Sequence, residues 1–253
     1  MKTAFRTDVG QIRSINEDRA VITELPNGWL LAVLADGMGG HQAGDVASQS
    51  AVDRLASELG RLESGKPDGE LREHLRETIA RANAYIHAQS VSRPELAGMG
   101  TTLVAALASP DRVFIAHVGD SRAYLLHGDE LVQLTEDHSL VNELVRSGQI
   151  SPEEAKAHPQ RNVLTRALGT EPFVAPDLHE LEWSAGDLLL LCTDGLTNMI
   201  NEADIYNTLR GEGDLDAMAE RLVEQALEAG GSDNVSVILV RNEEDAGGEG
   251  GDR

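Results

Sequence analysis

The stretch Leu30-Leu31-Ala32-Val33-Leu34-Ala35-Asp36-Gly37 carries a short apolar run directly into an Asp-Gly pair. A run of this length, rich in Leu and Val, is typical of a buried β-strand. Two further apolar runs, at 113–120 and 188–194, also end in an aspartate, and Asp233 leads into a fourth run at 235–240. The sequence therefore places carboxylates at the rims of several buried strands.

Carboxylates at the rim of a sheet are costly to bury unless a positive group meets them. Divalent cations such as Mg²⁺ and Mn²⁺ prefer oxygen ligands, so we expect Asp36, Asp194 and Asp233 to bind metal directly. Two metals about 3.5–4 Å apart share a bridging carboxylate, and we assign this role to Asp36 because Gly37 lets the backbone approach closely. A single Asp-Gly pair is more often a turn. Its repetition favours a metal site and chemistry on a phosphate.

The segment Arg13-Ser14-Ile15-Asn16-Glu17-Asp18 adds one cation and two carboxylates. The planar guanidinium of arginine suits phosphate, so Arg13 is a candidate phosphate ligand. Glu17 and Asp18 are candidates to orient metal-bound waters from outside the inner ligand set. Taken alone, this segment reads as a polar loop.

Composition argues against several classes of function. The chain has 253 residues, of which 41% are hydrophobic, and 21 Lys and Arg stand against 43 Asp and Glu, a net charge of -22. This balance opposes binding to nucleic acid or to an anionic membrane surface, because both require cations.

The single cysteine, Cys192, lies in an apolar run and reads as a core residue. One cysteine fits a reducing compartment. The sequence given shows no signal region and no membrane span, and we expect a cytoplasmic monomer.

The order of elements indicates the fold class. Strand-like runs are expected at 3–9, 19–24, 29–35, 100–134, 175–182, 187–193 and 235–241. Between the first three and the next, Leu71, Leu75, Ile79, Ala82 and Ile86 recur at helical spacing. A polar stretch at 57–69 reads as a loop, and 201–229 reads as helix broken near 211–213.

Strands and helices cluster instead of alternating, which favours an α+β fold with mainly antiparallel sheets. Two stacked antiparallel sheets flanked by helices would bury the apolar faces. We expect one catalytic domain over 1–241, with a segment of short helices and irregular chain at 136–169. The acidic, Gly-rich segment 242–253 is expected to be a disordered tail.

Several motifs in order resemble the bacterial type 2C metal-dependent Ser/Thr protein phosphatases. They span nearly the whole chain, and one motif alone would be weak evidence. The motifs are 13–18, Ala35-Asp36-Gly37-Met38-Gly39-Gly40-His41, Gly98-Met99-Gly100-Thr101-Thr102, Val118-Gly119-Asp120-Ser121-Arg122, Thr193-Asp194-Gly195-Leu196 and Gly231-Ser232-Asp233-Asn234-Val235.

The resemblance implies an α-β-β-α sandwich with a metal pair in a cleft at the sheet edge. By the same resemblance, Asp36 bridges two Mn or Mg ions, the Gly37 carbonyl binds one of them, and Asp194 and Asp233 complete one position. Asp120 is similar to a family residue that supports a third, weaker metal together with Asp194. The remaining implied roles are phosphate binding by Arg13, water or ligand-shell contacts by Glu17 and Asp18, and orientation of Asp233 by Asn234.

The implied reaction is attack of a metal-activated water on phosphoserine or phosphothreonine, with no covalent phosphoenzyme. The leaving oxygen then needs a proton. Eukaryotic members carry His directly after the Asp-Gly pair, whereas this chain has Met38. His41 and a metal-bound water are both candidate general acids, and a helix-start role for His41 is an alternative.

Segment 136–169 resembles the family's flap. Arg146, Arg161 and Arg166 within it could meet substrate phosphate or could be structural charges. The implied partners are phosphoproteins, namely a Hanks-type Ser/Thr kinase and its targets. Two alternatives stay open at this stage: a pseudophosphatase that only binds phosphoproteins, and a phosphatase of small molecules.

Overall fold

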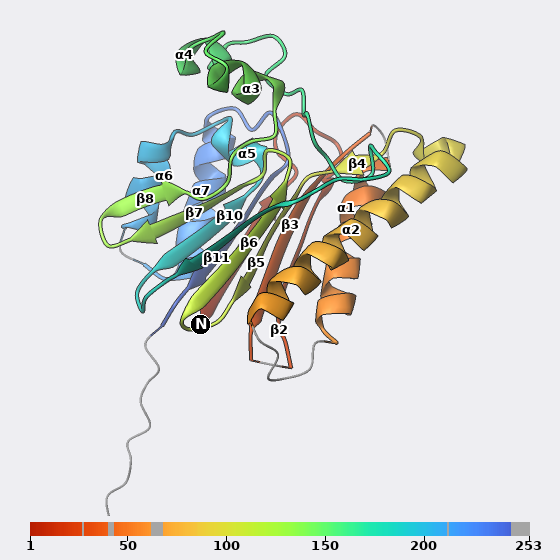
Figure 1. Cartoon of the computed structure of the whole chain (residues 1–253). Coiled ribbons are helices and arrows are strands. Elements are labelled where there is room, and N and C mark those ends of the chain that lie inside the picture. The colour runs from red at the N-terminus through yellow and green to blue at the C-terminus, as the bar shows by residue number, and fades with distance from the viewer. Residues whose placement is uncertain (27, 40–42, 62–67, 212, 244–253) are drawn as a thin grey trace, which may run out of the picture.

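The computed structural model describes residues 1–26, 28–39, 43–61, 68–211 and 213–243. Two antiparallel sheets lie face to face at its centre, and helices cover both outer faces (Figure 1). The sheet we call sheet A has the strand order β1 (Lys2–Asp8), β11 (Val235–Arg241), β10 (Leu188–Cys192), β7 (Arg122–His127) and β8 (Glu130–Gln133). Sheet B has the order β2 (Asp18–Glu24), β3 (Leu30–Met38), β5 (Leu103–Ala108), β6 (Arg112–Val118) and β9 (Asp177–Glu182), and β4 (Gly100–Thr101) pairs with β3.

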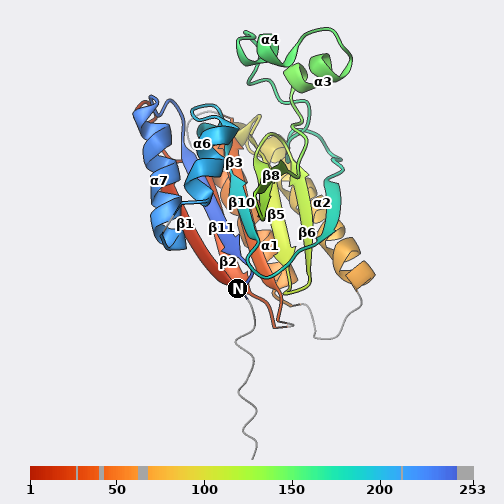
Figure 2. The same cartoon turned by 90° about the vertical axis from the view of Figure 1, so that its left-hand side faces the viewer.

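Helices complete the outer layers. Sheet B is covered by α1 (Ala43–Leu59) and α2 (Asp68–Ser92), and the 3₁₀ turn η1 (Pro94–Leu96) follows them. Sheet A is covered by α5 (Asp194–Thr197), α6 (Glu202–Leu209) and α7 (Leu215–Glu228). Figure 2 shows the same layers from the side, with α7 and α2 on opposite outer faces.

The core consists of layers because successive side chains of a strand point to opposite faces. In β10, Leu189 and Leu191 pack between the sheets, while Leu188, Leu190 and Cys192 pack toward α5–α7. Leu189 is fully buried. A strand with apolar residues on both faces therefore needs cover on both sides, which the sandwich provides.

The predicted α+β sandwich is confirmed. Each expected strand is present, and the helical stripe of Leu71, Leu75, Ile79, Ala82 and Ile86 is buried in the core between α2 and sheet B. The expected helical region 201–229 consists of α6 and α7. No helix in the described residues is long and apolar enough to cross a membrane.

Two boundaries differ from the prediction. The expected loop at 57–69 is shorter, because α1 continues to Leu59, whose side chain is buried, and α2 begins at Asp68. Polar residues on the outer face of α1 hid this last turn. Asn242, which we assigned to the tail, is 2% exposed and donates from Nδ2 to the Pro110 carbonyl oxygen over 2.8 Å. Ordered chain thus extends past β11, and 244–253 lie outside the described residues.

Segment 136–169, here called the flap, leaves the sandwich after β8 and returns before β9. It contains α3 (Leu140–Arg146) and α4 (Pro152–Lys156), each with a serine cap: Ser139 Oγ accepts from the Asn142 amide, and Ser151 forms a reciprocal capping box with Glu154. In both views the flap stands beyond one end of the sandwich (Figures 1 and 2).

Replacing Leu189 by alanine tests the layered core. We expect Leu189→Ala to lower the free energy of unfolding by about 2–5 kcal/mol, because it leaves a cavity between the sheets. Val91→Ala is the control, since Val91 is 73% exposed and its loss should change stability by less than about 0.5 kcal/mol. Urea denaturation measures the free energy of unfolding of both variants. Equally small losses of stability in Leu189→Ala and Val91→Ala would contradict the assigned position of Leu189 between the sheets.

Candidate metal centre and active site

Two aspartates face each other across neighbouring strands. Asp18 on β2 and Asp36 on β3 are direct cross-strand partners in the antiparallel register. Like charges at such a position repel. Asp18 is 3% exposed and accepts hydrogen bonds from Ser236 Oγ at 2.7 Å and Thr193 Oγ1 at 3.0 Å, both on the same oxygen, Oδ2. The pair therefore forms the floor of a strongly acidic site.

Three more aspartates arrive from other chain segments. Asp120 follows β6, Asp194 opens α5, and Asp233 lies two residues before the start of β11. The Asp36 and Asp194 carboxyl groups lie close enough for each to affect the pKa of the other. Strand ends of both sheets therefore meet at one edge of the sandwich, and the structure brings together the carboxylates that the sequence placed at separate strand rims.

Burial and mutual repulsion raise the pKa of these groups. Burial is the largest cause at each site, and neighbouring carboxylates raise the pKa further, while hydrogen bonds from Ser236 and Thr193 oppose the rise at Asp18. The pKa rises to about 7 for Asp18, about 8 for Asp120 and about 6 for Asp194. Burial and the charges of Asp18 and Asp194 also raise the pKa of Asp36 well above its ordinary value. Ionised carboxylates so placed require a cation.

Buried oxygens without partners show where such cations fit. Among the described residues, Asp18 Oδ1, Asp194 Oδ1 and Glu17 Oε1 are buried and accept no hydrogen bond. Burial also raises the pKa of Glu17, and the nearby Arg13 opposes that rise. At this site the carboxylate oxygens outnumber the hydrogen-bond donors that the protein offers them. Oxygen ligands of this kind are the ones that Mg²⁺ and Mn²⁺ prefer. The side chains present therefore fit divalent cations.

Arg13 lies against the cluster. Its Nη2 is 2.7 Å from Asp233 Oδ2, and its side chain remains 49% exposed. The guanidinium is thus held at the mouth of the site by a carboxylate and also faces solvent, where a phosphate could reach it. Sequence reasoning placed Arg13 at the site but missed this ion pair, because the two residues are 220 positions apart.

The backbone around Asp36 is fixed by the Thr101-Thr102 motif. Thr102 Oγ1 accepts from the Asp36 amide at 3.0 Å, and Thr101 Oγ1 donates to the Asp36 carbonyl oxygen at 2.9 Å. Gly37 packs against the backbone of Gly44 in α1, and a Cβ there would clash with the Gly44 carbonyl. The close approach expected of Gly37 is therefore used to bring β3 against the start of α1.

Asn234 holds the loop that carries Arg13. Its Oδ1 accepts from the Glu17 amide at 2.8 Å, while Nδ2 donates to the carbonyl oxygens of Val9 and Ile15 at 2.9 and 3.0 Å. Its contact with Asp233 is through the backbone, since the Asn234 amide donates to Asp233 Oδ1. The side chain thus anchors residues 9–17 at the sheet edge. Sequence reasoning missed this role, because only contacts across the fold reveal it.

Two other residues bear on the chemistry. His41, a candidate general acid, lies outside the described residues. Burial raises the pKa of the Cys192 thiol to about 12, and the side chain is fully buried. A thiol in this environment does not supply a thiolate nucleophile, as expected for a core residue.

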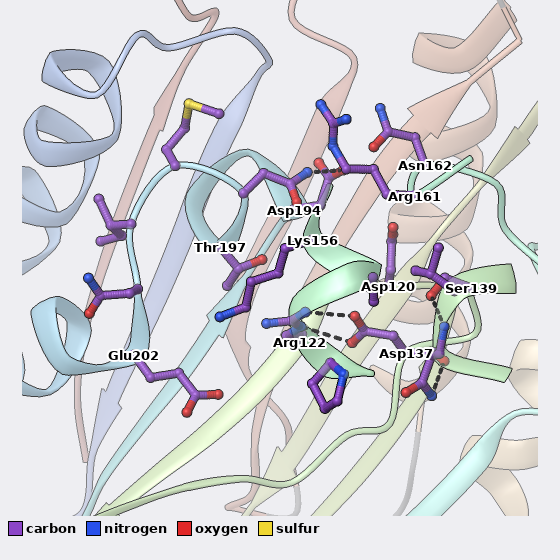
Figure 3. A pocket seen from close by; sticks show the side chains of 18 of the residues that line it. Asp120, Arg122, Asp137, Ser139, Lys156, Arg161, Asn162, Asp194, Thr197 and Glu202 are labelled. Carbon is purple, nitrogen blue, oxygen red and sulfur yellow. Dashed lines mark hydrogen bonds and ion pairs between the residues drawn. The ribbon is translucent and has the colours of Figure 1, made fainter. Parts of the chain in front are cut away.

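A cavity of about 790 Å³ extends from Asp120 and Asp194 to the flap (Figure 3). At its base Arg122 donates to both oxygens of Asp137, at 2.9 and 2.7 Å. Of the flap arginines, Arg146 pairs with Glu136 and Arg166 with Asp177. Arg146 and Arg166 are therefore structural charges, because each forms an ion pair within the protein.

A second group with possible ligand atoms lies at the base of the flap: His117, His138 and Asp177. His138 Nδ1 accepts from the Gly119 amide at 3.1 Å, which places the proton of the neutral ring on Nε2, 3.3 Å from Asp177 Oδ2. Burial lowers the pKa of His138 to about 4, so the ring is neutral. Both nitrogens of His138 thus form hydrogen bonds, which fasten the flap to Gly119 and to Asp177 on β9. Within the described residues, His117 Nδ1 is buried and has no hydrogen-bond partner.

Comparisons with known proteins agree with this geometry. The family model described as "Protein phosphatase 2C" matches residues 11–238. The serine/threonine phosphatase stp of Listeria innocua is 45% identical over 240 residues, covering 95% of each chain.

Solved structures give the same result. A crystal structure of a bacterial serine phosphatase superimposes with a TM-score of 0.92 at 42% identity, covering 97% of this chain and 99% of that one. The catalytic domain of the serine/threonine protein phosphatase PstP, in complex with two manganese ions, gives a TM-score of 0.83 at 40% identity, covering 94% of this chain and 96% of that one. The family match, the shared fold and the converging carboxylates show that this chain belongs to the protein phosphatase 2C family.

Proposed function

We propose that this protein is a Mn- or Mg-dependent phosphatase that hydrolyses phosphoserine and phosphothreonine in proteins. The observation that carries the proposal is the convergence of buried carboxylates from both sheets, with oxygens that lack partners within the described chain. The family and the relatives named as Ser/Thr phosphatases support a phosphoprotein substrate. A binding-only pseudophosphatase is disfavoured, because Asp36, Asp194 and Asp233 are all present.

The placement of the carboxylates supports the following ligand roles. Asp36 would be the carboxylate shared by two metals, because the charges of Asp18, Asp194, Asp120 and Asp233 all act on its carboxyl group. Asp194 and Asp233 would hold one of the metals, and the Gly37 carbonyl would bind one of them. Further contacts to the metals or their waters come from Asp120, at a third and weaker site, and from Glu17 and Asp18.

When bound, the cations would supply a water of lowered pKa and positive charge against the phosphate oxygens. Arg13 would bind the phosphate from the solvent side of the cluster, where its guanidinium already lies. Asp18, held by Ser236 and Thr193, keeps one face of the site fixed and polar. The reaction then needs no protein nucleophile, and His41 is one candidate to protonate the leaving oxygen.

The cellular setting is part of the same proposal. The substrates would be a Hanks-type Ser/Thr kinase and its targets, and the enzyme would reverse their phosphorylation as a cytoplasmic monomer. The net charge of -22 opposes a nucleic-acid substrate. A phosphatase of small molecules is the competing possibility, and phosphothreonine peptides compared with sugar phosphates distinguish the two by kcat/KM.

Removing the bridging carboxylate tests the metal assignment. We expect Asp36→Asn to lower kcat on a phosphothreonine peptide by about 10²–10³-fold, the cost of losing one preorganised charge-stabilising group. Asp53→Asn, an exposed position on α1, is the matched control and should retain wild-type activity. Normal turnover by a folded Asp36→Asn variant would overturn the assignment.

Arg13→Ala tests phosphate binding. Hydrogen bonds to charged groups contribute about 1.5–3 kcal/mol, so KM for the peptide should rise at least about tenfold, with a smaller change in Mn affinity measured by calorimetry. Arg6→Ala, the same change in the same N-terminal segment, serves as control. If Mn affinity falls and KM stays constant, Arg13 acts on the metal site instead of the phosphate.

Metal removal tests the reaction class. Phosphate release from the peptide should stop in EDTA and return when Mn²⁺ is added in excess. Release that continues after complete chelation, verified by metal analysis of the protein, would exclude the proposed chemistry.

A further inference from the structure

The cavity beside the metal centre is larger than a phosphorylated side chain needs. Its lining begins at Asp120 and Asp194, continues over α5 and α6, and is closed on the other side by the flap (Figure 3). A volume of about 790 Å³ is in the range that holds a small ligand. The space therefore accommodates residues of a substrate peptide next to the phosphorylated one.

Two cations in this lining have no ion-pair partner within the described chain. Lys156, the last residue of α4, and Arg161, on the flap loop that follows, both face the cavity (Figure 3). The other basic side chains of the flap and its base are paired: Arg122 with Asp137, Arg146 with Glu136 and Arg166 with Asp177. In a chain with twice as many acidic as basic residues, unpaired cations facing one cavity are a specific feature.

The remaining charges of the lining leave these cations available. Asp137 is neutralised by Arg122, and Asp120 and Asp194 belong to the proposed metal centre. Glu202, at the start of α6, is the one further carboxylate in the lining. Outside the proposed metal centre, the two unpaired cations Lys156 and Arg161 therefore outnumber the one remaining carboxylate, Glu202.

We propose that this cavity is a substrate subsite for an anionic side chain, either Asp or Glu or a second phosphorylated residue, close in sequence to the phosphoresidue. Lys156 and Arg161 are its specificity-determining residues. The inference rests on the proposed protein phosphatase activity and names the class of phosphoprotein preferred: acidic or multiply phosphorylated segments.

The local cations act against the field of the whole molecule. A net charge of -22 repels acidic peptides, but beyond about 8 Å that repulsion is screened at physiological salt. Contacts within the cavity are shorter than this distance and survive screening. Apolar side chains such as Val141 and Val145 on α3 share the lining, so an ion pair formed there is partly removed from water.

The test compares phosphothreonine peptides at 150 mM salt with Mn²⁺. One peptide has neutral flanks, two carry Asp and Glu on the N-terminal or C-terminal side, and one carries a second phosphothreonine. We expect kcat/KM for at least one acidic peptide to exceed that of the neutral peptide by about three- to tenfold, the effect of one or two partly exposed ion pairs.

Charge reversal identifies the residues responsible. Lys156→Glu and Arg161→Glu should each lower the ratio of acidic to neutral kcat/KM at least about threefold, and Lys156→Arg should keep it. Arg221→Glu is the matched control: it makes the same charge change at an exposed position of α7, on the outer face of sheet A, and should leave the ratio within about twofold.

The outcomes separate the subsite from the proposed function. Acceleration by Asp and Glu, or only by the second phosphate, supports the subsite and identifies the anion that it takes. Equal kcat/KM for all peptides, or a ratio that both reversal variants leave unchanged, overturns the subsite alone. Absence of Mn-dependent turnover of every peptide by the wild-type protein overturns the proposed function and the subsite with it.

Discussion

Repulsion between buried carboxylates is the constraint on which the rest of this structure depends. Asp18 and Asp36 face each other across β2 and β3, and Asp120, Asp194 and Asp233 arrive beside them. Such an arrangement opposes folding unless cations are supplied. Among the described residues, Arg13 forms an ion pair with Asp233, and the charge of Arg122 lowers the pKa of Asp120. The remaining compensation must come from bound metal, and the same charges that bind it are then placed for catalysis.

The sandwich makes this concentration of charge possible. Buried strands of both sheets bring their ends to one edge, and hydrogen bonds with Thr101, Thr102, Ser236 and Thr193 fix the carboxylate-bearing backbone and side chains there. Asn234 attaches the Arg13 loop to the same edge. The flap is fastened separately, through His138 and Gly119, next to Asp120. A rigid base thus carries the charges, while the flap bounds the space where a substrate chain would lie.

Much of this arrangement could be predicted from sequence. Apolar runs ending in aspartate, such as 30–36, indicated both the buried strands and the carboxylate site, because periodicity and burial are local properties. The partners of those carboxylates could not be predicted in this way. Asp18 was predicted to contact metal-bound water or to belong to the ligand shell, but the sequence did not reveal that it is almost fully buried and accepts from two hydroxyl donors, Ser236 on β11 and Thr193 after β10. The Arg13–Asp233 and Arg122–Asp137 pairs likewise depend on strand register across the fold, and the length of α1 was hidden by its polar outer face.

Thermal unfolding of the wild-type protein and of Asp36→Asn, each in EDTA and in excess Mn²⁺, tests the central claim most directly. If the cluster is a repulsive site stabilised by metal, Mn²⁺ raises the wild-type Tm, since a ligand at 100 times its Kd stabilises by about 2.7 kcal/mol. In EDTA the Asp36→Asn variant should unfold at a higher temperature than the wild type, because one repelling charge is gone, and Mn²⁺ should raise its Tm far less. The account would be contradicted if Mn²⁺ left the wild-type Tm unchanged and the Asp36→Asn variant unfolded at a lower temperature than the wild type in EDTA.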